Sequence, residues 1–165
     1  MDPRRASDLA GRAHAPVVRY FEALGSREPQ RRTDDFLLWL QDRGLSARLD
    51  RVPRSPRQFL KGLLALFSGK DSAEAAAAFD DAWWKGVLGR AIERTRARLL
   101  SERRIVPFLV YERRADAATL GPQMGLSEED VLGYLDEVRG RVLTEARAEL
   151  EADGEGPEAL DLLRP

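Results

Sequence analysis

Residues 116–141 contain two helical patterns that meet at a tight break, and this junction restricts the possible folds more than any other stretch. Gly125 can end the first helix because glycine accepts the left-handed backbone that often closes a helix. Ser127 can cap the second helix, and the three acids after it suit the positive end of the helix dipole. The second helix repeats apolar residues on one face, at Val131, Leu135, Val138 and Val142. This pattern predicts a helix-turn-helix, although an ordinary helical hairpin gives the same spacing.

The remaining segments also space their apolar residues at helical intervals. We expect an arginine-rich loop over 45–54 and helices over 7–24 (where Pro16 breaks or starts the helix), Thr33 to Gly44, Ser55 to Gly69, Asp71 past Leu99 and 107–111. Because no useful length of chain alternates polar and apolar residues, we predict an all-α protein.

The length of 165 residues is enough for one hydrophobic core or for two small helical lobes. We predict two small helical lobes joined by a long helix. The expected division is an N-terminal lobe over 1–70, a long linker helix and a short helix over 71–114, a helix-turn-helix lobe over 115–153 and a flexible tail over 154–165.

The composition argues against most catalytic chemistry. The chain has no cysteine, and its single histidine, His14, lacks any supporting motif for a base or a metal ligand. The adjacent acids Asp80 and Asp81 do not face each other on a helix, and neither do Glu128 and Glu129. We therefore predict no catalytic, cofactor or metal site and no enzyme. No apolar run approaches the length of a membrane span, so we expect a cytoplasmic protein without a membrane partner.

The charge is unevenly distributed along the chain. Residues 115–165 hold 13 acids and four arginines, a net charge of −9, whereas residues 1–114 carry a net charge of +8. Such a division predicts either that the two parts attract each other or that they bind different partners.

Four segments, taken in order over roughly residues 15–150, have a distinctive spacing. The first is Thr33 with Phe36–Leu40, and the second is Arg57, Phe59, Leu60, Leu64 and Phe67. The third joins Phe79–Trp83 to Val87, Leu88, Arg90–Ile92 and Arg94. The last is Met124–Ser127 with Val131, Leu135, Val138 and Arg139. In this order the segments resemble the extracytoplasmic-function sigma factor family. The resemblance implies a two-lobed helical protein that binds core RNA polymerase, with a last lobe that reads promoter DNA.

Several positions differ from that family's pattern. The family has basic residues along its recognition helix, where this chain has Leu132, Asp136 and Glu137. Contacts to phosphates need lysine or arginine, so the acidic C-terminal part makes DNA binding doubtful. We therefore expect a sigma-like transcription regulator that acts through RNA polymerase or protein contacts, with promoter reading weakened or lost. The alternative is an adaptor module outside transcription, built on the same helical scaffold.

Three surfaces are candidates for function. The recognition-helix surface, for DNA or a protein partner, comprises Ser127, Glu128, Leu132, Asp136, Glu137, Arg139 and Arg141. A polymerase or partner face comprises Arg32, Asp34, Asp35 and Trp39. A phosphate-binding or lobe-docking face comprises Arg90, Arg94 and Arg98. Trp83 and Trp84 could stack on bases, but their helical spacing favours a core position for one of them.

Overall fold

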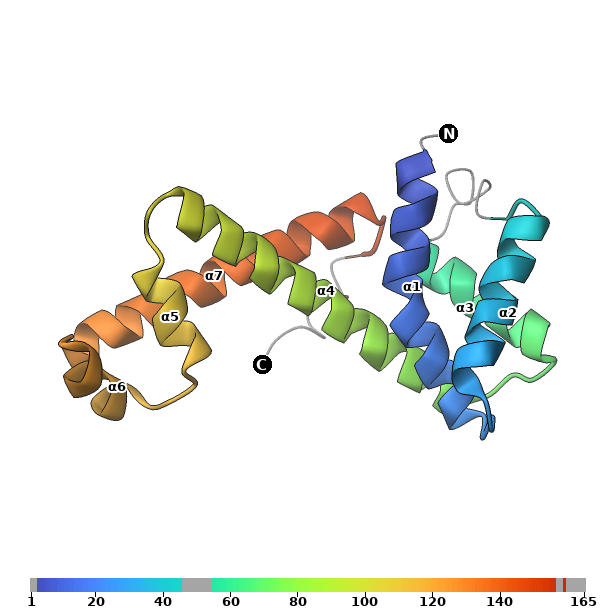
Figure 1. The fold of residues 1–165 in the computed structure, drawn as a ribbon, viewed down its shortest axis with the longest axis horizontal. Coiled ribbons are helices and arrows are strands. Elements are labelled where there is room, and N and C mark those ends of the chain that lie inside the picture. Colours follow the sequence, from blue (N-terminus) through green and yellow to red (C-terminus); the bar gives the residue numbers. More distant parts are fainter. Residues whose placement is uncertain (1–2, 46–54, 157–158, 160–165) are drawn as a thin grey trace. The chain divides into compact units, whose positions relative to one another are not determined.

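The computed structural model describes residues 3–45, 55–156 and 159. These residues form helices and no strands, which confirms the prediction of an all-α protein (Figure 1). The helices are α1 (Pro3–Ala23), α2 (Pro29–Asp42), α3 (Pro56–Ser68), α4 (Ala73–Ser101), α5 (Val106–Glu112), α6 (Ala117–Met124) and α7 (Glu128–Ala152). All of the expected loop after residue 45 and most of the expected tail lie outside the described residues.

The chain divides into two compact units. The N-terminal unit comprises Met1–Gly86 with Asp153–Glu155, and the C-terminal unit comprises Val87–Ala152 with Gly156–Pro165. The boundary falls within α4, so this helix contributes its first part to one unit and its second part to the other. The lobe boundaries expected at residues 70, 114 and 153 stay predictions.

An aromatic core fills the N-terminal unit. Tyr20 and Phe21 on α1, Phe36 on α2 and Phe79 on α4 are all buried. The ring of Phe67 on α3 lies 5.4 Å from that of Phe36. Trp83 is only 1 % exposed, as expected for a core residue.

The expectation that Pro16 breaks or starts a helix was wrong, because α1 continues through Pro16.

Helix α3 begins and ends where the sequence predicted. Ser55 Oγ accepts a hydrogen bond from the backbone N–H of Gln58, and Pro56 occupies the first helical turn. Gly69 closes the helix with a φ of 66°, a conformation that costs glycine little. Local capping therefore sets both ends of this helix.

Arg57 on α3 is the centre of an ion cluster in the N-terminal unit. It contacts Asp80 at 2.6 Å and Glu155 at 2.9 Å, and its guanidinium lies 4.6 Å from the centre of the Trp84 ring. Burial alone would lower the pKa of Arg57, but its hydrogen bonds to Glu155 and Asp80 outweigh burial and raise the pKa. Arg57 is therefore held in its charged form.

The C-terminal unit has a hydrophobic cluster where α5, α6 and α7 meet. Val110, Ala117, Leu120 and Val131 are buried together. Met124, Leu126, Tyr134 and Leu135 are partly buried against this cluster. Val131 and Leu135 of the apolar stripe thus pack on the short helices, whereas Leu132 and Asp136 of the same helix are exposed.

Candidate functional site

The turn between α6 and α7 is tight and glycine-dependent. Gly125 has a φ of 66°, and its N–H donates to the carbonyl oxygen of Gly121. The N–H of Leu126 donates to the same carbonyl at 2.9 Å. These two bonds satisfy a carbonyl at the end of α6 and direct the chain into α7.

Gly121 permits the close approach of α6 to this turn. A Cβ atom at Gly121 would lie 2.8 Å from the carbonyl oxygen of Leu126, closer than real Cβ contacts allow. The backbone oxygen cannot move aside as a flexible side chain could. The helix pair therefore requires glycine here, a requirement that the sequence analysis did not identify.

Side-chain caps start both helices. Asp116 accepts from the N–H of Thr119 at 2.8 Å at the start of α6. At the start of α7, the N–H of Asp130 donates to Ser127 Oγ at 3.0 Å, and Asp130 accepts from Ser127 in return. Hydrogen bonds from the Ser127 side chain and then its backbone lower the pKa of Asp130. Ser127 thus positions the helix rather than projecting its hydroxyl toward a ligand.

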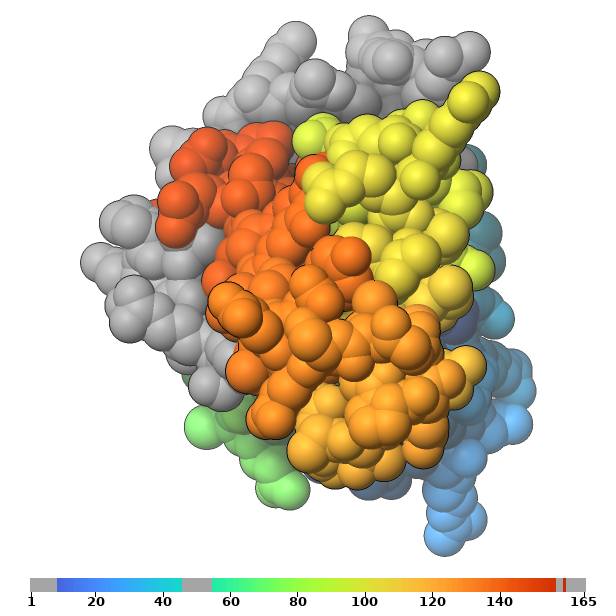
Figure 2. Space-filling model, turned by 90° about the vertical axis from the view of Figure 1, so that its left-hand side faces the viewer, coloured from blue at the N-terminus to red at the C-terminus, as the bar shows by residue number. Residues whose placement is uncertain are grey.

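The exposed face of α7 near its N-terminus is acidic, with an apolar residue among the acids. Glu128, Glu129 and Asp136 are exposed, and Leu132 is 50 % exposed. Arg139 approaches Asp136 at 3.7 Å. In Figure 2, α6 and α7 face the viewer in amber and orange, beside the yellow end of α4 and α5. A rod-like anion such as duplex DNA would meet carboxylates at this surface.

Two residues of the predicted recognition surface lie in ion pairs on another side of α7. Glu137 accepts two hydrogen bonds from Arg104, each 2.9 Å long. Arg141 binds Glu102 at 2.9 Å and Glu137 at 3.1 Å. The hydrogen bond from Arg141 lowers the pKa of Glu102, and the same bond raises the pKa of Arg141. The structure therefore separates Glu137 and Arg141 from the exposed set of Glu128, Leu132, Asp136 and Arg139.

The arginine face on α4 is occupied by acids of α7. Arg90 reaches Glu149 at 2.6 Å, and Arg98 reaches Glu145 at 2.7 Å. Arg94 lies between them and contacts both acids. Both glutamate side chains are less than a tenth exposed. Of the two readings of this face, these contacts favour docking against acids of the C-terminal part.

Glu145 and Glu149 are the residues that the sequence reasoning missed. A signal was present, because both the arginines of α4 and the glutamates of α7 repeat every four residues and so line one face of each helix. Residues 87–152 hold eleven arginines and twelve acids, a net charge of −1. The charge of −9 assigned to residues 115–165 is thus largely offset within the folded unit, and the acidic character is local to the start of α7.

The candidate face on α2 contains both engaged and exposed side chains. Asp34 and Asp35 are exposed, and Asp34 lies 3.8 Å from His14. Arg32 lies over the rings of Phe21 and Phe67. Trp39 is half-buried with its ring 6.0 Å from that of Phe36. The acids are therefore accessible to a partner, whereas Arg32 and Trp39 also stabilise the aromatic core.

Comparisons with known proteins give no relative. Neither a family model, a curated protein nor a solved structure matches the chain. Within residues 3–45, 55–156 and 159, no cluster of three or more acids and histidines is arranged to bind a metal ion. The same residues include no helix that combines the length and the apolar character needed to cross a membrane.

Proposed function

We propose that this protein is a sigma-like transcription regulator that acts through RNA polymerase or another protein, with promoter reading weakened or lost. The proposal rests on the order of the family-like segments together with the α6–α7 geometry. A three-residue turn with a left-handed Gly125 and the close approach at Gly121 support a helix-turn-helix. This backbone geometry is the single observation that carries the proposal.

The side chains on that frame support a protein partner rather than DNA. Duplex readers place lysine and arginine where the second helix meets the phosphates. Here Glu128 and Asp136 project from that face, and Leu132 between them is half exposed. An exposed leucine among acids suits an apolar pocket with a basic rim on a protein partner.

Co-purification with core RNA polymerase tests the proposal. The full chain should form a complex with purified core enzyme at micromolar concentration. Asp34→Lys with Asp35→Lys should weaken that complex, because these acids are exposed on the candidate polymerase face. Glu74→Lys, an exposed acid on α4, is the control for a general charge effect. If the unaltered chain forms no complex, action through RNA polymerase is overturned.

The exposed acids of α7 also favour a second function, an adaptor module outside transcription. An adaptor of this kind would bind a basic or apolar groove of another protein and would ignore both polymerase and DNA. A gel-shift series with random duplex at low salt tests DNA binding, which an adaptor should lack. Tight binding that weakens with salt would exclude the adaptor.

A further inference from the structure

The exposed side of α7 carries a row of residues whose second half mirrors its first with the charges reversed. The row, called the outer row below, comprises Glu128, Leu132, Asp136, Arg139, Leu143 and Arg147, all exposed. Each residue follows the previous one by three or four positions. Steps of this size each complete about one helical turn, so the outer row lies along one narrow face of α7.

The two halves of the outer row have opposite charges and one leucine each. Both acids lie in the first half and both arginines in the second, so the row has no net charge. Leu132 lies between the two acids and is 50 % exposed, and Leu143 lies between the two arginines and is 38 % exposed. The centre of the row falls between Asp136 and Arg139. The outer row is therefore complementary to a reversed copy of itself.

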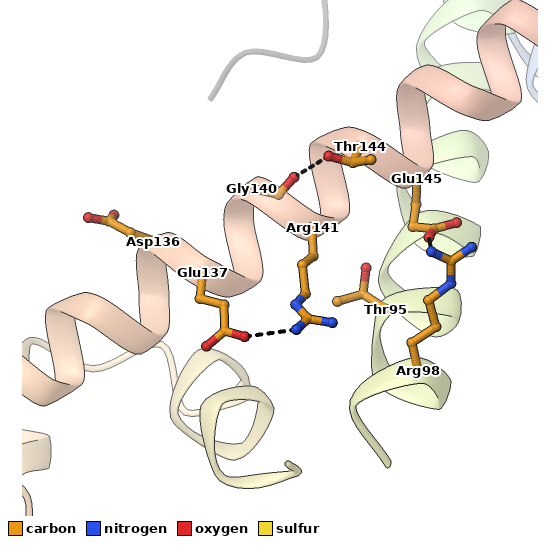
Figure 3. A pocket seen from close by; sticks show the side chains of 8 residues that line it. All are labelled: Thr95, Arg98, Asp136, Glu137, Gly140, Arg141, Thr144 and Glu145. Carbon is orange, nitrogen blue, oxygen red and sulfur yellow. Dashed lines mark hydrogen bonds and ion pairs between the residues drawn. The ribbon is translucent and has the colours of Figure 1, made fainter. Parts of the chain in front are cut away.

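The side chains at the centre of the outer row are accessible to a partner. Asp136 and Arg139 contact each other at 3.7 Å, yet their side chains are 81 % and 60 % exposed. In Figure 3 the Asp136 side chain points away from Glu137 and Arg141, which turn toward each other. The ion pairs that α7 makes with residues 90–104 thus leave the outer row available.

We propose that a second copy of the chain binds the outer row, with the two α7 helices antiparallel. Pairing about the centre of the row brings Leu132 of one copy opposite Leu143 of the other, and Asp136 opposite Arg139. The first acid of the row then faces its last arginine. Parallel pairing in register would instead oppose like charges, which is unfavourable. A two-fold interface uses the same patch on both copies, and this patch meets that requirement.

This pairing rests on the proposed function only in assigning the exposed face of α7 to a protein partner. In the pair, Leu143 between two arginines supplies the apolar contact with a basic rim that Leu132 among acids suits. Polymerase is not required, and Asp34 and Asp35 on α2 take no part.

Sedimentation equilibrium of the full chain, without polymerase, tests the pairing. One helix face is smaller than a standard interface, so we expect a weak, reversible dimer and measure up to about 1 mM chain. Arg139→Asp places acids opposite each other and should weaken dimerisation roughly tenfold or more. Asp136→Arg should weaken it similarly. The two changes combined place opposite charges face to face again and should restore the dimer.

Two exposed leucines give a matched control. Leu143→Glu places a charge in the outer row and should weaken the dimer about tenfold or more. Leu100→Glu changes a leucine of α4 that is 59 % exposed and lies outside the row, so it should leave the dimer unchanged.

Disulfide cross-linking tests the direction of the two helices. The chain has no cysteine, so Leu132→Cys and Leu143→Cys each introduce a single thiol. In the antiparallel pair these two positions face each other, whereas the two copies of position 132 lie about 16 Å apart along the helices. That distance is too long for a disulfide. A mixture of the two variants with oxidised glutathione should form the mixed disulfide, and neither variant alone should cross-link.

Three results would each overturn the pairing. They are a monomer at every concentration, a dimer that Arg139→Asp leaves unchanged, and cross-links between identical positions in place of the mixed one. The polymerase complex is measured separately through Asp34 and Asp35, so its absence would leave the dimer standing, and a monomeric chain would leave the polymerase complex standing.

Discussion

Arg98 Nη1 lies 2.7 Å from Glu145 Oε1, so an arginine that is 66 % exposed neutralises a carboxylate that is 7 % exposed. The two partners are thus in very different surroundings. Arg94 contacts the same glutamate at 3.3 Å and also contacts Glu149. Loss of Arg98 leaves Glu145 with one cation, whereas loss of Arg94 removes a cation from two buried acids.

Alanine substitutions should therefore have unequal effects on stability. Arg94→Ala should lower the free energy of unfolding by about 1–3 kcal/mol, because two buried carboxylates lose a charged hydrogen bond. Arg98→Ala should cost about 0–1 kcal/mol, as an exposed partner does. Urea denaturation measures both, with Arg147→Ala as the control. Equal effects of Arg94→Ala and Arg98→Ala would contradict the shared pairing of Arg94.

Two glycines allow a matched test of the helix pair. Gly121→Ala should be destabilising, since its Cβ would lie 2.8 Å from the carbonyl oxygen of Leu126. Gly133→Ala on α7 meets nothing within 4 Å, so it should stabilise by about 0.5–1 kcal/mol through helix propensity. Thermal melts of both variants check the prediction. A Gly121→Ala protein as stable as the Gly133→Ala protein would show that the turn is looser than described.

Two leucines of the same helix pair test how its core is packed. Leu120 is 1 % exposed, so Leu120→Ala should cost about 2–5 kcal/mol. The apolar stripe suggested the same cost for Leu135, but Leu135 is only partly buried. Leu135→Ala should therefore cost clearly less than Leu120→Ala in denaturant melts. If Leu135→Ala costs more than Leu120→Ala, then Leu135 is the more deeply buried of the two leucines.

Asp130 gives a dependence on pH whose direction follows from its pKa. Hydrogen bonds from Ser127 lower the pKa of Asp130 in the folded chain. Its contribution to stability is therefore present above the ordinary aspartate pKa and lost as pH falls through the lower folded value. Asp130→Asn should be less stable than the unaltered chain at neutral pH, and the difference should shrink below about pH 4. Urea midpoints measured across this range check it, and a constant difference would contradict it.

The sequence predicted those helix ends well that are coded locally, but the helix expected to start at Thr33 starts at Pro29, and Thr33 is buried within it. Ser55, Gly69, Ser127 and Gly125 act through neighbours within a few residues, and the structure places each as expected. The sequence indicated a helix break or start at Pro16, but α1 continues through this proline. Val17 and Tyr20, which follow it on α1, are buried in the core. Tertiary context overrode a local rule there.

The candidate surfaces were harder to predict because they depend on residues distant in sequence. Glu137 and Arg141 share a helix with Leu132 and Asp136, yet their partners Arg104 and Glu102 follow α4, more than 30 residues earlier. Net charge counted along the chain allowed for an attraction between the arginines of α4 and the acidic part, but it did not identify Glu145 and Glu149 as their partners. The requirement for Gly121 arises from a single backbone approach that periodicity does not encode.

The exposed face of α7 allows a test of whether charge alone keeps the helix from DNA. Leu132→Arg with Asp136→Lys places two cations on this face without touching the Arg104–Glu137 pair. Random duplex should then bind more tightly, and the logarithm of the affinity should fall more steeply with salt, by about 0.9 for each new phosphate contact. Electrophoretic shifts at several salt concentrations measure this slope. Arg139→Lys, which keeps the charge, is the control. Unchanged affinity in the double variant would mean that this face of α7 cannot reach a duplex.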